Sequence, residues 1–337
     1  MSTLPLQPSS AEPEHDQAAP HRWATLVLQA GSLLAFAAVL IFFSATAPFF
    51  LSFFNFTNVI AQSAILAILA FGMTIVIIGG GANVVTGGID LSVAANLGLS
   101  AAVYASLIQA GHGDSTAVAA TLLTGLLIGG ANAFAVVIVG ILPLLATLAV
   151  MNVAAGLELV LTENTVVPAS SSFLMAINDA GPLGIPNLAY IVIIVAIIVT
   201  AIVQYSALGL RLYAVGEHRE AARAAGLPVQ RYIVGTYLAS GLFAAIAAIL
   251  SVAYLSGSST GSAELLLGVV VTSLLGVVFS RRLVPTITGS LLAALFIGFL
   301  SNGFQLLNIS SYWVSGVQGA LILVVVAVTS ILRRKET

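Results

Sequence analysis

Few side chains in this sequence could carry out chemistry, and two of them are acids within apolar stretches. Asp90 is the only charged residue between Arg22 and Asp114, and it lies in the glycine-rich stretch GGGANVVTGGIDLSV at residues 79–93. A carboxylate at membrane depth beside broken helix ends could bind H⁺ or Na⁺, and Glu158 is a second candidate. These acids raise the hypothesis of an ion-coupled secondary transporter.

Enzyme chemistry is not indicated by the remaining residues. The sequence has no cysteine, no H-E-x-x-H motif and four scattered histidines, at positions 15, 21, 112 and 218, so we expect no metal site. Its single lysine, Lys335, lies in the tail, whereas a phosphate-binding loop needs a lysine in GxxxxGK[ST]. We therefore expect no catalytic residue and no cofactor in this chain.

The composition indicates an integral membrane protein. Of the 337 residues, 59% are hydrophobic and 7% are charged, and the mean hydropathy is +1.12, whereas soluble domains carry about 25% charged residues. Ten apolar segments are long enough to span a lipid bilayer as helices. They lie near 24–45, 57–79, 91–110, 116–139, 141–161, 187–205, 231–255, 264–280, 284–302 and 312–332.

The basic residues test this count of ten helices. They form four groups, at Arg22, at 211–231, at 281–282 and at 333–335. The positive-inside rule places every group in the cytoplasm, so an even number of helices must separate them, and the intervals are six, two and two. We therefore expect an all-α membrane protein with both termini cytoplasmic, a disordered tail at 1–22, a membrane domain at 23–332 and a short tail at 333–337.

A short helix is expected in the cytoplasmic loop at 206–231. Within EHREAARAA, Glu217 and Glu220 are placed in the first turn, where acids favour the helix dipole. Gly226 is expected as the residue after the helix end, and Pro228 prevents its continuation. A helix this short is unstable alone in water and needs a partner surface.

That partner surface could be a protein or the membrane. Arg219 and Arg223 share one side of the helix at i, i+4 spacing, and its other residues are mostly alanines. Membrane-surface helices use an apolar face with Trp, Phe or Leu, so a protein groove is favoured. On the outer side, the loop at 162–186 could equally be a docking surface or a solvated loop with an interfacial helix.

Two motifs resemble one family of transporters. The stretch YAVGEHREAARAAGLPV resembles the EAA-type cytoplasmic coupling loop of ABC importer permeases, in particular the ribose, xylose, arabinose and autoinducer-2 permease family. The stretch TGGIDLSV resembles a second signature of that family, and residues 142–162 and 301–323 resemble its middle and C-terminal segments. The resemblance thus spans most of the chain beyond residue 50.

The resemblance implies a type II-like permease in the bacterial inner membrane that works as a dimer, with a homodimer expected. Its implied partners are a cytoplasmic ATPase with two nucleotide-binding domains, which holds the ATP and Mg²⁺, and a periplasmic protein that delivers a monosaccharide. No nucleic-acid partner is expected. The residues implied for ATPase coupling are Arg219, Glu220, Ala221, Ala222, Arg223 and Gly226. The signature residues implied near the translocation path are Gly87, Gly88, Asp90, Leu91 and Ser92.

Amide and aromatic side chains in the membrane could also contact a sugar. Asn302 and Trp313 are candidates for the path, because sugars are bound by amide hydrogen bonds and by stacking. The alternative is that the amide joins two helices and that the tryptophan lies at the membrane interface. For Asp90, we expect a cap at the start of the third helix, with Ser92 in its first turn, ahead of direct contact with substrate.

Overall fold

The computed structural model describes residues 19–81, 87–280, 283–310, 313–321 and 323. In this part of the chain the regular structure is helical, and strand-like pairing is limited to two isolated bridges, Pro168 with Gly257 and Ala180 with Pro186. The all-α fold expected from the sequence is therefore confirmed.

The helices follow one another along the chain with short connections. The long ones are α1 (Ala19–Thr46), α2 (Phe53–Gly80), α3 (Val93–Gln109), α4 (Asp114–Ala133), α5 (Pro143–Thr162), α7 (Asn187–Tyr205), α10 (Val229–Leu255), α11 (Leu265–Val278) and α12 (Ile287–Leu306). The short ones are α6 (Ser172–Asn178), α8 (Ala207–Glu217), α9 (Arg219–Ala224), the π-helical turn η1 (Phe134–Val139) and the 3-10 turns η2 (Pro182–Gly184) and η3 (Ser262–Glu264).

Six helical stretches in the described residues are long and apolar enough to cross a membrane: α2, α4 with η1, α5, α7, α10 and α12. Three shorter apolar helices accompany them, at Leu33–Thr46 in α1, in α3 and in α11. Each of these nine coincides with a segment expected from the sequence. Residues 313–321 of the tenth segment are helical, but most of that segment lies outside the described residues. Ten spans with cytoplasmic termini remain a prediction.

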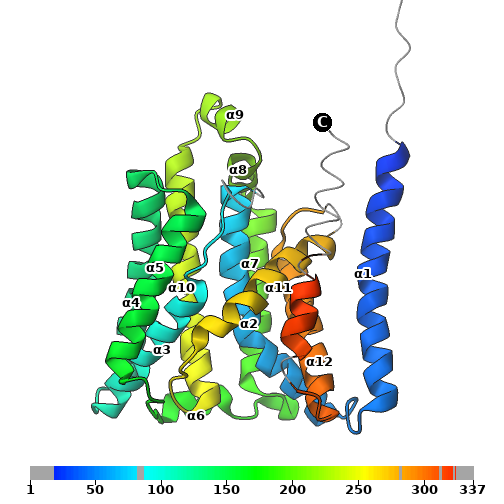
Figure 1. Cartoon of the computed structure of the whole chain (residues 1–337), viewed down its shortest axis with the longest axis vertical. Coiled ribbons are helices and arrows are strands. Elements are labelled where there is room, and N and C mark those ends of the chain that lie inside the picture. Colours follow the sequence, from blue (N-terminus) through cyan, green and yellow to red (C-terminus); the bar gives the residue numbers. More distant parts are fainter. Residues whose placement is uncertain (1–18, 82–86, 281–282, 311–312, 322, 324–337) are drawn as a thin grey trace, which may run out of the picture.

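The centre of the bundle is α2, which packs against α7, α10, α11 and α12. In its most apolar stretch 89% of the residues are buried, against 22% in α5 and 28% in α4 with η1. The exposed side chains of these outer helices are largely apolar, as a lipid environment allows. Figure 1 shows α8 and α9 at one end of the bundle and α6 at the opposite end.

Small residues bring α4 and α10 into backbone contact. A Cβ added to Gly241 would lie 2.1 Å from the carbonyl oxygen of Gly125, and one added to Gly129 would lie 2.4 Å from that of Tyr237. Such close approach is typical of membrane helices packed through small residues. It sets Asn132 of α4 and Ser240 of α10 close enough to meet one carboxylate.

Candidate functional site

Asp90 is the centre of a buried polar cluster that joins three parts of the bundle. Asp90 is 1% exposed. Oδ1 accepts hydrogen bonds from the backbone N–H of Ser92 at 3.0 Å, from the hydroxyl of Ser92 at 2.6 Å and from Nδ2 of Asn132 at 3.1 Å. Oδ2 accepts from the hydroxyl of Ser240 at 2.7 Å. The carboxylate therefore ties the start of α3 to α4 and α10.

The cap expected at Asp90 is displaced by two residues. Helix α3 begins at Val93 with Ser92 at the N-cap position, and Ser92 makes no capping hydrogen bond through its side chain. Asp90 instead accepts from the Ser92 N–H in the turn before the helix. Sequence reasoning missed Asn132 and Ser240 as its partners, because two polar residues in apolar helices do not reveal which helix faces which.

The signature segment folds back onto the end of α2. Helix α2 ends at Gly80 and α3 begins at Val93, so the expected interruption of the helix is confirmed. The N–H of Gly88 donates to the carbonyl of Gly81 at 3.1 Å, and a Cβ on Gly88 would lie 2.0 Å from the carbonyl oxygen of Val76. Gly87 is buried beside it, and residues 82–86 lie outside the described residues. Only glycine fits at position 88.

The loop at 206–231 forms two helices rather than one. The chain breaks at His218, whose φ of −143° and ψ of 91° are not helical. Glu217 therefore ends α8 and is not in the first turn of the next helix, as the sequence had suggested, whereas Glu220 is. The break lets α9 turn away from α8.

The end of α9 is a Schellman motif. Gly226 has φ +82° and donates from its N–H to the carbonyl of Arg223 at 3.0 Å, while Leu227 donates to the carbonyl of Ala222 at 3.0 Å. This pair of bonds satisfies the last carbonyls of a helix and favours glycine in the left-handed position. The role expected for Gly226 as the residue after the helix end is confirmed.

The residues of α9 divide into an outward and an inward set. The side chains of Glu220 and Arg223 are 96% and 62% exposed and form an ion pair at 3.5 Å, and Ala221 is exposed between them. Ala222 is 5% exposed and packs with Val215, Val229 and Leu227.

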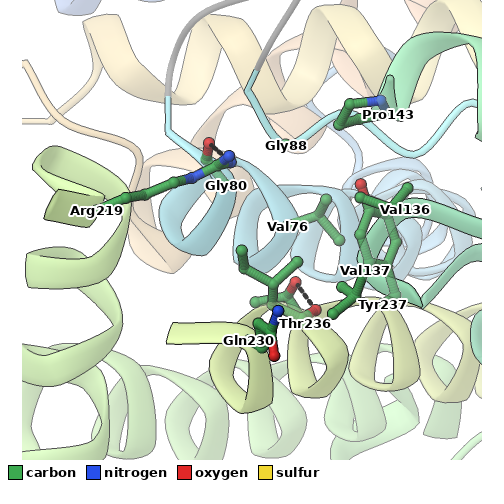
Figure 2. Close-up of a pocket in the computed structure, with 11 residues that line it drawn as sticks. Val76, Gly80, Gly88, Val136, Val137, Pro143, Arg219, Gln230, Thr236 and Tyr237 are labelled. Carbon is green, nitrogen blue, oxygen red and sulfur yellow. Dashed lines mark hydrogen bonds between the residues drawn. The ribbon is translucent and has the colours of Figure 1, made fainter. Parts of the chain in front are cut away.

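Arg219 belongs to the inward set although it is one turn from Arg223. Its Nη2 donates to the carbonyl oxygen of Gly80 at 2.7 Å (Figure 2). It also lines a cavity of about 150 Å³ between α2, η1 and α10. The polar part of the cavity wall is Arg219, Gln230, Thr236 and Tyr237, and the signature residue Gly88 also lines it. The cavity thus lies between the loop at 206–231 and the signature segment.

Asn302 and Trp313 are not brought together with this cavity. Asn302 is 7% exposed and exchanges two amide hydrogen bonds with Asn55 of α2, at 2.9 and 3.0 Å. Its observed contacts are those of the interhelical alternative. The side chain of Trp313 is 67% exposed. Neither residue lines the cavity.

Glu158, the second acid considered for ion coupling, lies on α5, which packs against α3 and α4. It is 5% exposed, and its carboxylate occupies the space beside Gly98 of α3, where an added Cβ would lie 2.3 Å from Oε2. No group of three or more His, Asp or Glu residues that could hold a metal ion is found in the part of the chain that the structure describes.

The loop at 162–186 contains α6 and lies at the end of the bundle opposite α8 and α9 (Figure 1). Val167 accepts a backbone hydrogen bond from Ser258 at 2.8 Å and donates to the hydroxyl of Ser258 at 2.9 Å. The carboxylate of Asp114 accepts from the hydroxyls of Tyr104 at 2.8 Å and Ser171 at 2.7 Å. A short helix, which one of the two interpretations of this loop included, is present as α6 and is capped by Ser171.

These features define a multi-pass helical membrane protein with a short helix exposed at one end. A family profile described as the permease component of the branched-chain amino acid transport system matches residues 55–326. The chain belongs to this family of transport permeases, and its resemblance to the sugar ABC importer permeases is confirmed by the following relatives.

Curated relatives cover almost the whole chain. The ribose import permease protein of Escherichia coli (strain K12) is 32% identical over 309 residues, which are 90% of this chain and 94% of that protein. The ribose import permease protein of Bacillus subtilis (strain 168) is 34% identical over 310 residues, 91% and 93% of the two chains. The L-arabinose ABC transporter permease protein of Azospirillum brasilense is 28% identical over 328 residues, 95% and 94% of the two. No solved structure matches the chain.

Proposed function

We propose that this chain is the membrane subunit of an ATP-driven importer for a monosaccharide or a related polyol. Its relatives are named as a ribose import permease, an L-arabinose ABC transporter permease and a galactofuranose transporter permease, and this supports a sugar as the substrate class. The sugar would be delivered by a periplasmic binding protein, and a cytoplasmic ATPase would bind ATP and Mg²⁺. The membrane would be the bacterial inner membrane.

The observation that carries the proposal is the exposed helix α9. Its outward side chains are an ion pair, Glu220 with Arg223, and the small Ala221 between them. Its inward side is anchored by Ala222 and by the Schellman end. A helix of six residues has little stability of its own and needs a surface to pack on. Its exposed face, one alanine between two charged side chains, is best explained as a contact for a second protein.

The mechanism follows from the position of α9. ATP binding would close the two nucleotide-binding domains, and the α9 helices of two permease chains would move with them. Two copies of this chain, or this chain with a similar one, would then rock between inward and outward access. The end of the bundle that carries α6, opposite α8 and α9 (Figure 1), would receive the binding protein.

Ion coupling through Asp90 is less well supported. A carboxylate that binds a transported ion needs access to it, whereas Asp90 is 1% exposed and accepts four hydrogen bonds from protein groups. These contacts favour a structural role.

The test is uptake by the reconstituted importer. With the ATPase and binding protein supplied, the wild-type chain should import sugar only with ATP. The variant Glu220→Arg places two like charges at i, i+3 and should lower both ATPase copurification and uptake by about tenfold or more. Glu163→Arg makes the same charge change at an exposed residue beyond the end of α5, and it should leave copurification unchanged. Uptake driven by an ion gradient without ATP would refute the proposal.

A further inference from the structure

The coupling loop is joined to the end of α2 at two successive points. The first is a backbone contact, since a Cβ on Gly216 of α8 would lie 1.8 Å from the carbonyl oxygen of Ile78. A Cβ on Gly81 would in turn lie 2.7 Å from the carbonyl oxygen of Gly216. Nothing larger than hydrogen fits at position 216, so the backbones of α8 and the last turn of α2 are in direct contact.

The second point is the hydrogen bond from Arg219 to Gly80. The carbonyl of Gly80 is at the C-terminus of α2, where the last four carbonyls have no partner within the helix and carry partial negative charge. A guanidinium offers several N–H donors in a fixed plane and stays charged. The 2.7 Å hydrogen bond therefore attaches α9 to the end of α2 through a charged donor with a defined orientation.

From Gly80 the contacts continue into the signature segment. A Cβ on Gly80 would lie 2.2 Å from the Cα of Gly88, and the N–H of Gly88 donates to the carbonyl of Gly81. Two residues further on, Asp90 bonds to Asn132 of α4 and Ser240 of α10. Close contacts thus connect α9 with three membrane helices, α2, α4 and α10.

We propose that Arg219 is a positioning residue that transmits the movement of α9 to the signature segment, and that it is not a contact for the ATPase. The inference rests on the proposed function, and it reassigns a residue that the sequence grouped with the coupling surface. Glu220 and Arg223 make the outward contact, while Arg219 links that contact to Gly80. Loss of the link should let α9 follow the ATPase without moving the bundle.

The test compares Arg219→Gln with Arg223→Gln, which removes the same charge one turn further on from an exposed position. The importer is reconstituted with its ATPase and binding protein, and three quantities are measured: copurification of the ATPase, ATP hydrolysis and sugar uptake. We expect Arg219→Gln to copurify with the ATPase and to import about tenfold less sugar per ATP hydrolysed, the size expected for one charge-assisted hydrogen bond. Arg223→Gln should lower copurification while preserving the ratio of sugar to ATP in the complexes that form.

The sequence contains no cysteine, so a single introduced cysteine can report movement of this chain directly. A cysteine introduced at Val137, in the cavity wall, reports access for a charged thiol reagent. Its labelling rate should change when the ATPase is trapped with ADP and vanadate, and this change should be lost with Arg219→Gln. Arg219→Lys, which keeps a charge but not the planar fork, should give an intermediate change.

An independent variant acts on the first contact. Gly216→Ala should reduce the ratio of sugar to ATP in the same way, whereas Gly235→Ala, where an added Cβ meets nothing within 4 Å, should not. The inference is overturned if Arg219→Gln loses the ATPase as Arg223→Gln does, or if it keeps the wild-type ratio and labelling change. Either result can occur in an importer whose wild type needs ATP, whereas uptake without ATP refutes the proposed function itself.

Discussion

Replacement of Asp90 gives a sharp test of how the membrane helices are held together. In Asp90→Ala, the N–H and hydroxyl of Ser92, the amide of Asn132 and the hydroxyl of Ser240 all lose their common acceptor. These groups are buried, and a buried donor left without a partner costs about 1–3 kcal/mol. Because the amide of Asn132 also donates to the hydroxyl oxygen of Ser92 at 2.7 Å and the serine hydroxyls can turn to other acceptors, we expect a net loss of about 3–5 kcal/mol.

Asp90→Asn keeps one acceptor oxygen and nearly the same volume, so it serves as the matched control. Its Oδ1 can retain the bonds from Ser92 and Asn132, and its new N–H₂ can donate to the hydroxyl of Ser240, which also accepts. We expect a loss of about 1 kcal/mol or less and uptake close to that of the wild type.

The assay is thermal unfolding of the detergent-solubilised chain, combined with uptake at matched amounts in the membrane. The Ala variant should unfold several degrees lower and the Asn variant close to the wild type. An Ala variant as stable as the wild type would refute the structural role. An Asn variant that is present at normal levels but inactive would show instead that the negative charge is needed.

Two further predictions concern the loop at 206–231. In Gly226→Ala, the alanine must adopt φ near +82°, at a cost of about 1 kcal/mol, so we expect weaker ATPase copurification. Gly235→Ala controls for the added methyl group. Unchanged ATPase binding by Gly226→Ala would show that the Schellman end does not position α9. Tyr213 of α8 donates to the carbonyl of Pro285 at 2.6 Å, and burial raises its pKa from 10.0 to about 12. The unfolded chain ionises this phenol at a lower pH than the folded chain does. The free energy of unfolding should therefore fall as pH rises from 10 towards 12. Tyr213→Phe should remove that part of the pH dependence in unfolding measurements, and identical profiles for the two proteins would contradict the assignment.

Much of the helical layout could be predicted from the sequence. Apolar length alone located nine helices in the described residues, because a chain in lipid must satisfy its backbone hydrogen bonds within each segment. The end of α9 at Gly226 was also predictable, since a glycine followed by a proline two residues on is a strong local signal. The break at His218 was not, because the nearby Gly216 lies within α8, neither a glycine nor a proline directly follows the break, and Glu217 continues a good helical pattern.

Only some residues of the candidate site were predictable from the sequence, and their contacts were not. Asp90, Gly88 and Arg219 stand out by type and spacing, and these are local properties of the sequence. Which donors meet the carboxylate of Asp90 depends on the approach of α4 and α10 through Gly125 and Gly241. That approach is a property of packed surfaces, which the order of residues along one helix does not specify.

The sequence by itself determined that this is a helical membrane protein, that a short helix in the loop at 206–231 ends at Gly226, and which glycines and acid interrupt the apolar runs. Only the tertiary structure decided that Arg219 turns inward to Gly80 while Arg223 faces outward. Helical periodicity places both arginines on one side of α9. The carbonyl that selects one of them comes from a helix 139 residues away in the sequence.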